Sequence, residues 1–175
     1  MERLRYLEVL ERTEVMAKLA AFNPHVVGTP PLGLDLSTSD IDVICFAPDA
    51  DAFTCAVWKA FGPRPEFRMW QWIGRDRPVV ANFADAGWMI EVFGQASPIS
   101  DQFGWRHFLV EQRLLALGGD SFREAVMAQR TSGMKTEPAF AAVLGLDGDS
   151  YKALLDLESC SDIELTALLE DQGFI

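Results

Sequence analysis

The pattern of apolar and polar positions changes once along the chain, near Ser97-Pro98. Before that point, apolar residues at loosely helical spacing predict one or two helices over 4–22, which end before Asn23-Pro24. Short β-branched or alternating runs then predict strands at 25–29, 41–46, 67–73, 79–83 and 88–93. A helix capped by Asp49 or Asp51 and ending at Phe61 is expected after the second of these strands. The first part of the chain therefore predicts a small mixed sheet with helices.

Beyond Pro98 the strand signal disappears and glycines separate stretches with helical periodicity. These stretches predict helices at about 101–117, 121–130, 137–144, 151–157 and 162–172. Ser121 with Glu124, and Ser161 with Glu164, have the spacing of capping boxes. We expect an α/β (α+β) fold, with a core at 1–97 and a C-terminal helical region at 98–175 packed on that core.

Composition mainly excludes classes of partner. The 175 residues are 49% hydrophobic, and 15 basic against 26 acidic residues give a net charge of −11. This charge disfavours polyanions, so we expect no long nucleic acid and no membrane as partners. No apolar run is long enough to span a bilayer and the N-terminus lacks an apolar leader, which predicts a cytoplasmic protein. The three cysteines lack CxxC spacing and are interpreted as reduced core thiols.

Candidate chemistry is concentrated in Gly28-Thr29, Asp40-Ile41-Asp42 and Glu91. Asp40 and Asp42 are two positions apart at the start of a predicted strand, so their side chains point to the same face and could bind a divalent cation. Glu91 lies inside the apolar run 88–93, where an unpaired charge is costly to bury. A metal ion shared with the two aspartates would be one partner for it.

The order Gly-Thr, Asp-x-Asp and a later single acid resembles the DNA polymerase β-like nucleotidyltransferase superfamily. That superfamily has Gly-Ser, a spacer of about ten residues, Asp-x-Asp and a third carboxylate. Over more of the chain, the segments 27–33, 39–42, 90–95 and 135–141 look like a small bacterial family near that superfamily, a domain of unknown function. The resemblance implies a nucleotidyltransferase-like α/β core at 1–97.

The resemblance also implies roles for individual residues. Gly28 and Thr29 would hold the phosphates of a nucleoside triphosphate, Asp40 and Asp42 would bind Mg²⁺ (or Mn²⁺), and Glu91 would complete the metal site beside the attacking oxygen. The implied reaction transfers a nucleotidyl group to an unknown small-molecule or protein acceptor. Metal-assisted hydrolysis uses the same ligands. A non-catalytic nucleotide-binding or protein-interaction module on the same fold is the alternative.

The helical region offers further candidates. His107 and Glu111 are spaced i, i+4 and share a helix face, where they could meet the acceptor or form a structural polar pair. Arg106 or Arg113 could contact a phosphate. Lys135, just outside a predicted helix start, could meet a triphosphate or be a solvated lysine.

Each core candidate also has a structural interpretation. Asp40 could be a capping or turn acid, with Asp42 a charge at the edge of the sheet, and Gly28 could serve only a tight turn. Glu91 could lie on a solvent face, paired with Arg68 or Arg75.

The five tryptophans are interpreted mainly as core residues. If one stacks on a nucleobase, the candidate is Trp70 or Trp72, which are expected on alternating faces of one strand. No basic groove for an acceptor is visible in the sequence.

Overall fold

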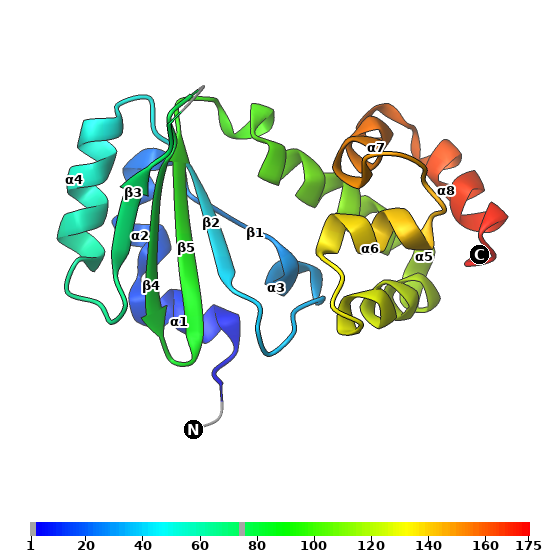
Figure 1. The fold of residues 1–175 in the computed structure, drawn as a ribbon, viewed down its shortest axis with the longest axis horizontal. Coiled ribbons are helices and arrows are strands. Elements are labelled where there is room, and N and C mark those ends of the chain that lie inside the picture. Colours follow the sequence, from blue (N-terminus) through cyan, green and yellow to red (C-terminus); the bar gives the residue numbers. More distant parts are fainter. Residues whose placement is uncertain (1–2, 74–75) are drawn as a thin grey trace. The chain divides into compact units, whose positions relative to one another are not determined.

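The computed structural model describes residues 3–73 and 76–175. The chain forms two compact units (Figure 1). The first unit holds the chain up to Pro31 together with Ser37–Gln102, and the second holds Leu32–Leu36 together with Phe103–Ile175. The units therefore differ from the expected division at 97/98 in two places.

Hydrogen bonds explain the division. The Gln102 side chain donates to the carbonyl oxygens of Cys45 at 3.1 Å and Ser97 at 2.9 Å, which ties the segment after 97 to the first unit. In the second unit, the Arg130 guanidinium donates to the carbonyl oxygen of Leu34 at 3.2 Å. Arg123 contacts the carbonyl oxygen of Leu32 in the same way. Backbone contacts between segments far apart in sequence leave no periodic signal, so hydropathy could not reveal them.

The first unit contains one mixed five-stranded sheet with the order β1-β2-β5-β4-β3. Its strands are β1 (His25–Val27), β2 (Ile41–Phe46), β3 (Arg68–Gln71), β4 (Val79–Asp85) and β5 (Trp88–Gln95). Strands β2 and β5 pair in parallel and the other neighbours pair antiparallel. The predicted α/β fold with a mixed sheet is confirmed.

One face of this sheet is packed against helices (Figure 1). The helical segments of the unit are α1 (Tyr6–Thr13), α2 (Val15–Lys18), η1 (Ala20–Phe22), α3 (Thr29–Leu32), α4 (Ala50–Phe61) and η2 (Ile99–Asp101), with α3 crossing into the second unit. Asp49 caps α4 by accepting from two backbone amides. Phe53, Val57 and Phe61 of α4 are fully buried, and the Phe61 ring stacks on Phe83 of β4 at 4.6 Å. This packing leaves the alternate residues of each strand on the second face.

The second unit is helical. It contains α5 (Phe103–Thr131), α6 (Thr136–Val143), α7 (Ser150–Asp156), η3 (Leu157–Ser159) and α8 (Asp162–Asp171). Its core includes Leu114, Phe122, Phe140, Leu154 and Leu165. The predicted break between two helices near residue 120 is confirmed, because Gly119, with φ 63° and ψ −156°, is non-helical and divides α5 into two helical stretches.

The two predicted capping boxes differ in outcome. The Ser161–Glu164 box at the start of α8 is confirmed, with the Ser161 side chain accepting from the Glu164 amide. The Ser121–Glu124 box is wrong, because the Ser121 hydroxyl donates to the carbonyl oxygens of Gly118 and Phe174. The helical stretch that follows the non-helical Gly119 is therefore not capped by the Ser121 side chain.

Among the described residues, no helix is long and apolar enough to cross a bilayer. The cysteines carry free thiols, but only Cys45 is a core residue. Its burial raises the pKa of that thiol to about 12. Cys55 is exposed and Cys160 half-buried, so the expectation of core thiols is wrong for these two.

Candidate functional site

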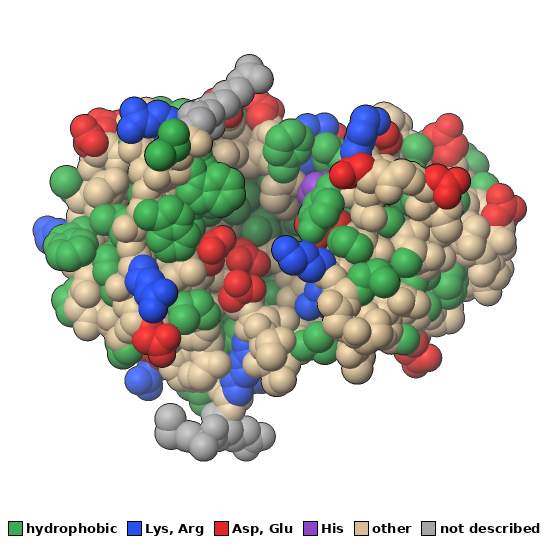
Figure 2. Space-filling view, in the orientation of Figure 1, with side chains coloured by type: hydrophobic (Ala, Val, Ile, Leu, Met, Phe, Trp, Pro, Cys, Tyr) green, Lys and Arg blue, Asp and Glu red, His purple; other side chains and the backbone are tan. Residues whose placement is uncertain are grey.

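The sheet register brings two of the predicted acids together. Strands β2 and β5 run in parallel with Asp42 directly opposite Glu91. Residues paired across neighbouring strands point to the same face, and the strands lie about 4.8 Å apart. Asp40 precedes Asp42 by two positions at the mouth of β2. Figure 2 shows acidic side chains gathered over β2 and β5.

Gly28 lies against the Asp42 carboxylate. It follows β1 with φ +76°, and a Cβ atom at this position would be 2.3 Å from Asp42 Oδ2. The next residue, Thr29, is buried and its hydroxyl donates to the Ser39 hydroxyl at 3.2 Å. Thr29 begins α3, so Pro30-Pro31 continues as a helical turn. Only glycine leaves room for the Asp42 side chain beside this turn.

The surroundings of Glu91 favour its protonated form. Burial raises the pKa of the Glu91 carboxyl above its ordinary value, and the charge of Asp40 raises it further. The Asn82 side-chain amide, opposite Glu91 on β4, opposes this shift by donating to Glu91 Oε2 at 3.3 Å. Glu91 therefore experiences a second carboxylate on one side and a neutral hydrogen-bond donor on the other.

The pairing of β3, β4 and β5 does not place Glu91 next to Arg68, one of the two arginines considered as its partner. Asn82 stands between them, since it pairs with Glu91 on one side and with Arg68 on the other. Arg75 lies outside the described residues. Asn82 is a residue of this site that the sequence did not reveal, because its place depends on the pairing of β4 with β5.

The donor chemistry of the site fits a hard divalent cation. Asp40, Asp42 and Glu91 offer carboxylate oxygens, the ligands that Mg²⁺ and Mn²⁺ prefer. Burial and, after it, the charge of Asp40 disfavour the ionised form of Glu91, and a bound cation would favour that form instead. Over residues 3–73 and 76–175, however, no three His, Cys, Asp or Glu side chains are already gathered closely enough to hold one ion. The three-carboxylate metal site therefore stays a prediction.

In the second unit, His107 and Glu111 are both buried on α5. His107 Nε2 lies 2.9 Å from the carbonyl oxygen of Tyr151, and Nδ1 lies 3.9 Å from Glu137 Oε1. Glu111 is 3% exposed, and within the described part of the chain its Oε1 has no hydrogen-bond partner. Burial and the charge of Glu137 hold the pKa of Glu111 well above its ordinary value. The roles of His107 and Glu111 toward an acceptor stay predictions.

The predicted phosphate contacts also lie in the second unit. Arg106 forms a two-armed ion pair with Glu158, with nitrogen–oxygen distances of 3.0 and 2.5 Å. Arg113 pairs with Asp162 at 2.7 Å. Lys135 is exposed at the N-cap of α6. A phosphate at Arg106 or Arg113 would compete with an existing carboxylate, and the phosphate contacts of Arg106 and Lys135 stay predictions.

Trp70 and Trp72 lie on the same face of β3 and its continuation, so the expectation of alternating faces is wrong. Residues two positions apart in an extended chain point to the same side. Trp70 pairs with Val80 of β4, and the Trp72 ring meets Phe93 of β5 edge to face at 5.9 Å. Both tryptophans are exposed on the face that carries Glu91, at 41% and 55%.

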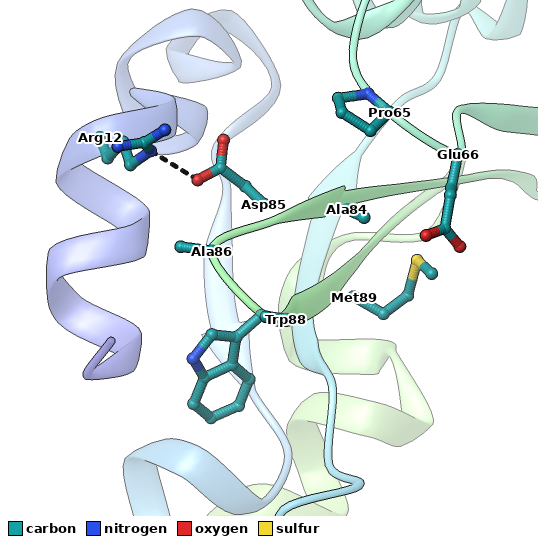
Figure 3. A pocket seen from close by; sticks show the side chains of 9 residues that line it. Arg12, Pro65, Glu66, Ala84, Asp85, Ala86, Trp88 and Met89 are labelled. Atoms are coloured by element: carbon teal, nitrogen blue, oxygen red, sulfur yellow. Dashed lines mark hydrogen bonds and ion pairs between the residues drawn. The ribbon is translucent and has the colours of Figure 1, made fainter. Parts of the chain in front are cut away.

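A separate pocket of about 480 Å³ lies at the turn between β4 and β5 (Figure 3). Arg12, Glu66, Asp85 and Trp88 are among its lining residues. Asp85 is buried and forms ion pairs with Arg12 at 2.7 Å and with Arg64 at 2.6 Å. Because two guanidinium groups already neutralise Asp85, this pocket is interpreted as a structural joint between α1 and the sheet.

This fold is shared with nucleotidyltransferases of the DNA polymerase β-like superfamily. The chain matches the GLD-2/RNP-8 complex structure with a TM-score of 0.55 and 11% identity over 95% of this chain and 75% of that one. It matches the Cid1 poly(U) polymerase with MgGTP bound with a TM-score of 0.56 and 12% identity, over 86% of this chain and 47% of the other. For a cytoplasmic RNA terminal U-transferase the TM-score is 0.52 at 12% identity, over 85% and 43%.

Within this fold class, the chain belongs to the family described as Domain of unknown function (DUF4269), whose model matches residues 8–157. No curated protein sequence matches it. The chain spans less than half of the Cid1 and U-transferase chains.

The comparison corrects the expectation about nucleic acid. The net charge of −11 predicted that no long nucleic acid would be a partner. Proteins with the same fold include a poly(U) polymerase and an RNA terminal U-transferase, so that exclusion is wrong. The charge of a whole chain describes its distant field and does not decide what a local site binds.

Proposed function

We propose that the protein is a metal-dependent nucleotidyltransferase that moves a nucleotidyl group from a nucleoside triphosphate to an acceptor hydroxyl. The observation that carries the proposal is the pairing of Asp42 with Glu91 on parallel strands, with Gly28 closed against the Asp42 carboxylate. The likeness to a fold that binds MgGTP in the Cid1 structure supports it.

Each residue would have a defined task. Asp40, Asp42 and Glu91 would hold Mg²⁺ or Mn²⁺, which when bound supplies positive charge against the triphosphate. Gly28, which lets the Asp42 carboxylate come close where a Cβ atom would collide with it, would hold phosphate oxygens through its backbone amide. The Thr29 hydroxyl, which donates a hydrogen bond to Ser39 in this structure, could rotate to donate to a phosphate instead.

In the transfer step, Glu91 would accept the proton that the acceptor hydroxyl releases. The acceptor oxygen forms a bond to the α-phosphorus while the bond from that phosphorus to the bridging oxygen breaks. Pyrophosphate leaves with the bonding electrons, and the hydroxyl proton passes to the Glu91 carboxylate. The Asn82 amide holds that carboxylate in place.

A non-catalytic nucleotide-binding module is the second candidate. It is favoured by the finding that, in the part of the chain the structure describes, no three acidic, His or Cys side chains already form a metal-binding group. Such a module would bind nucleotide without turnover.

The test compares Asp42→Asn and Glu91→Gln with wild type, and uses Glu11→Gln, an exposed position on α1, as the control. Calorimetry measures the binding of Mg²⁺ with each of the four ribonucleoside triphosphates, and pyrophosphate release is followed with a panel of acceptors. We expect Asp42→Asn to lose metal-dependent nucleotide binding and Glu91→Gln to retain much of that binding while losing turnover. Equal and metal-independent affinity in all variants would overturn the metal site. Tight wild-type binding without pyrophosphate release would favour the module.

A further inference from the structure

One row of paired residues crosses the whole sheet on the face that carries the acids. In sheet order, the row consists of Val27, Asp42, Glu91, Asn82 and Arg68. Strands lie about 4.8 Å apart, which places the backbone of Arg68 about 10 Å from that of Glu91. On the side of Glu91 away from Asp42, the row therefore continues with the neutral amide of Asn82 and then the exposed cation of Arg68.

The next row on the same face is apolar and aromatic. It consists of His25, Ile44, Phe93, Val80 and Trp70. Trp72 follows Trp70 by two positions and packs edge to face on Phe93. We call Arg68, Trp70, Trp72 and Phe93 the β3–β5 face. Figure 2 shows apolar side chains gathered beside the acidic ones, over β4 and β5.

The order of the strands separates two halves of the site. Gly28 and Thr29 follow β1, on the β1 side of Asp42, which is the side proposed for the donor phosphates. The attacking oxygen belongs beside Glu91, on β5. The remainder of the acceptor then extends toward β4 and β3, because the donor occupies the other direction.

The chemistry of the β3–β5 face selects the kind of acceptor. The Arg68 side chain is exposed, and within the described residues it has no ion pair or hydrogen bond, so it can meet an anionic group. Exposed tryptophans present flat surfaces on which bases stack, whatever their sequence. A single strand of nucleotides can place a phosphate at Arg68, in the first row, and a base at Trp70, in the next row. A duplex hides its bases in the stack and does not match the tryptophans.

We propose that the β3–β5 face binds the 3′ end of a single-stranded nucleic acid as the acceptor of the reaction. The terminal hydroxyl lies at Glu91, a base stacks on Trp70 or Trp72, and a phosphate meets Arg68. The inference rests on the proposed function for the group transferred, but the binding itself requires neither donor nor metal.

The experiment measures fluorescence anisotropy of 5′-labelled single-stranded RNA and DNA of one sequence, about 12 nucleotides long, without nucleotide or divalent metal. The variants are Trp70→Ala and Trp72→Ala, with Trp58→Ala as the control. Trp58 is 61% exposed on α4, a helix packed on the opposite face. We expect Trp70→Ala or Trp72→Ala to weaken binding roughly tenfold, a common loss when one stacking aromatic is removed, and Trp58→Ala to leave it unchanged. Binding of either oligonucleotide supports the proposal, and the tighter one identifies the acceptor.

The phosphate contact has its own measurement. Arg68→Ala should reduce the slope of log affinity against log salt by about 0.7, the loss of one contact to a single strand. Lys59→Ala, an exposed cation on α4, should leave the slope as it is. Trp70→Phe keeps an aromatic ring and should recover most of the affinity, which distinguishes lost stacking from misfolding.

Three results would overturn the inference. They are the absence of wild-type binding to either single strand, an equal loss in Trp58→Ala, and equally tight binding of a duplex. Self-association of the chain that is abolished by Trp70→Ala, without oligonucleotide binding, would assign the face to a protein partner instead. The proposed function fails separately, by metal-independent nucleotide binding in Asp42→Asn, so the two failures are distinguishable.

Discussion

Gly28 determines how close the chain after β1 can come to the Asp42 carboxylate. We expect Gly28→Ala to abolish nucleotide binding, since the new methyl group would lie 2.3 Å from Asp42 Oδ2. The left-handed φ of +76° should add a stability loss of about 1 kcal/mol. Gly133→Ala is the matched control, because Gly133 has φ +101° and open space around it. Thermal unfolding and calorimetry should show similar strain in both variants and lost binding only in the first. Unchanged binding in Gly28→Ala would contradict the site.

Glu111 makes stability depend on pH. Because its pKa is raised in the folded chain, the folded state holds a proton that the unfolded state has released, and stability falls as pH rises from the ordinary glutamate pKa through the raised one. We expect Glu111→Gln to be more stable than wild type at pH 7, by the order of 1 kcal/mol or more, with the difference shrinking toward pH 4.

Urea unfolding at both pH values measures this difference. Glu124→Gln, an exposed position on the same helix, is the control and should show no such trend. If the stability gain of Glu111→Gln over wild type were smaller at pH 7 than at pH 4, the raised pKa of Glu111 would be contradicted.

Residue type and spacing alone were enough to select the acidic residues and the glycine as candidates for one site. Asp42 and Glu91 do lie opposite each other, and Gly28 does lie beside Asp42. Asn82 and Arg68 could not be found in the same way. Their place in the row follows from the register of antiparallel strands, and a shift of one residue would move each to the other face.

The start of α8 depends on one capping box. Ser161→Ala should cost about 1 kcal/mol, because the Glu164 amide loses its acceptor and the reciprocal bond loses its geometry. Ser121→Ala should cost less than half as much, since that hydroxyl caps no helix. Chemical unfolding of both variants checks the difference, and equal losses would indicate that the box contributes nothing to α8.

Elements with strong local signals were predicted well, and elements decided by tertiary packing were not. The apolar run of β2 and the Asp49 cap of α4 appear at the expected residues. The break near residue 120 also appears where it was expected, because the non-helical backbone of Gly119 separates two helical stretches. The Ser121–Glu124 capping box was wrong, because the Ser121 hydroxyl donates to the carbonyl oxygen of Phe174, a contact between segments far apart in the sequence.

At the scale of the whole molecule, charge is divided between the units. Residues 147–175, all in the helical unit, carry −7 of the net −11. The overall charge therefore says little about the sheet unit, whose second face presents Arg68 beside exposed tryptophans. This distribution explains why reasoning from net charge excluded nucleic acid too readily.

The parallel pairing of β2 with β5 also determines when the site can exist during synthesis. Strand β5 occupies the position between β2 and β4, and its Glu91 follows Asp42 by about 50 positions. While the ribosome is still adding the segment between them, β2 has only β1 beside it. Closing so long a loop is slow compared with forming α4 locally. The two carboxylates therefore meet late, and the site proposed for nucleotide stays incomplete until residue 95 has left the exit tunnel.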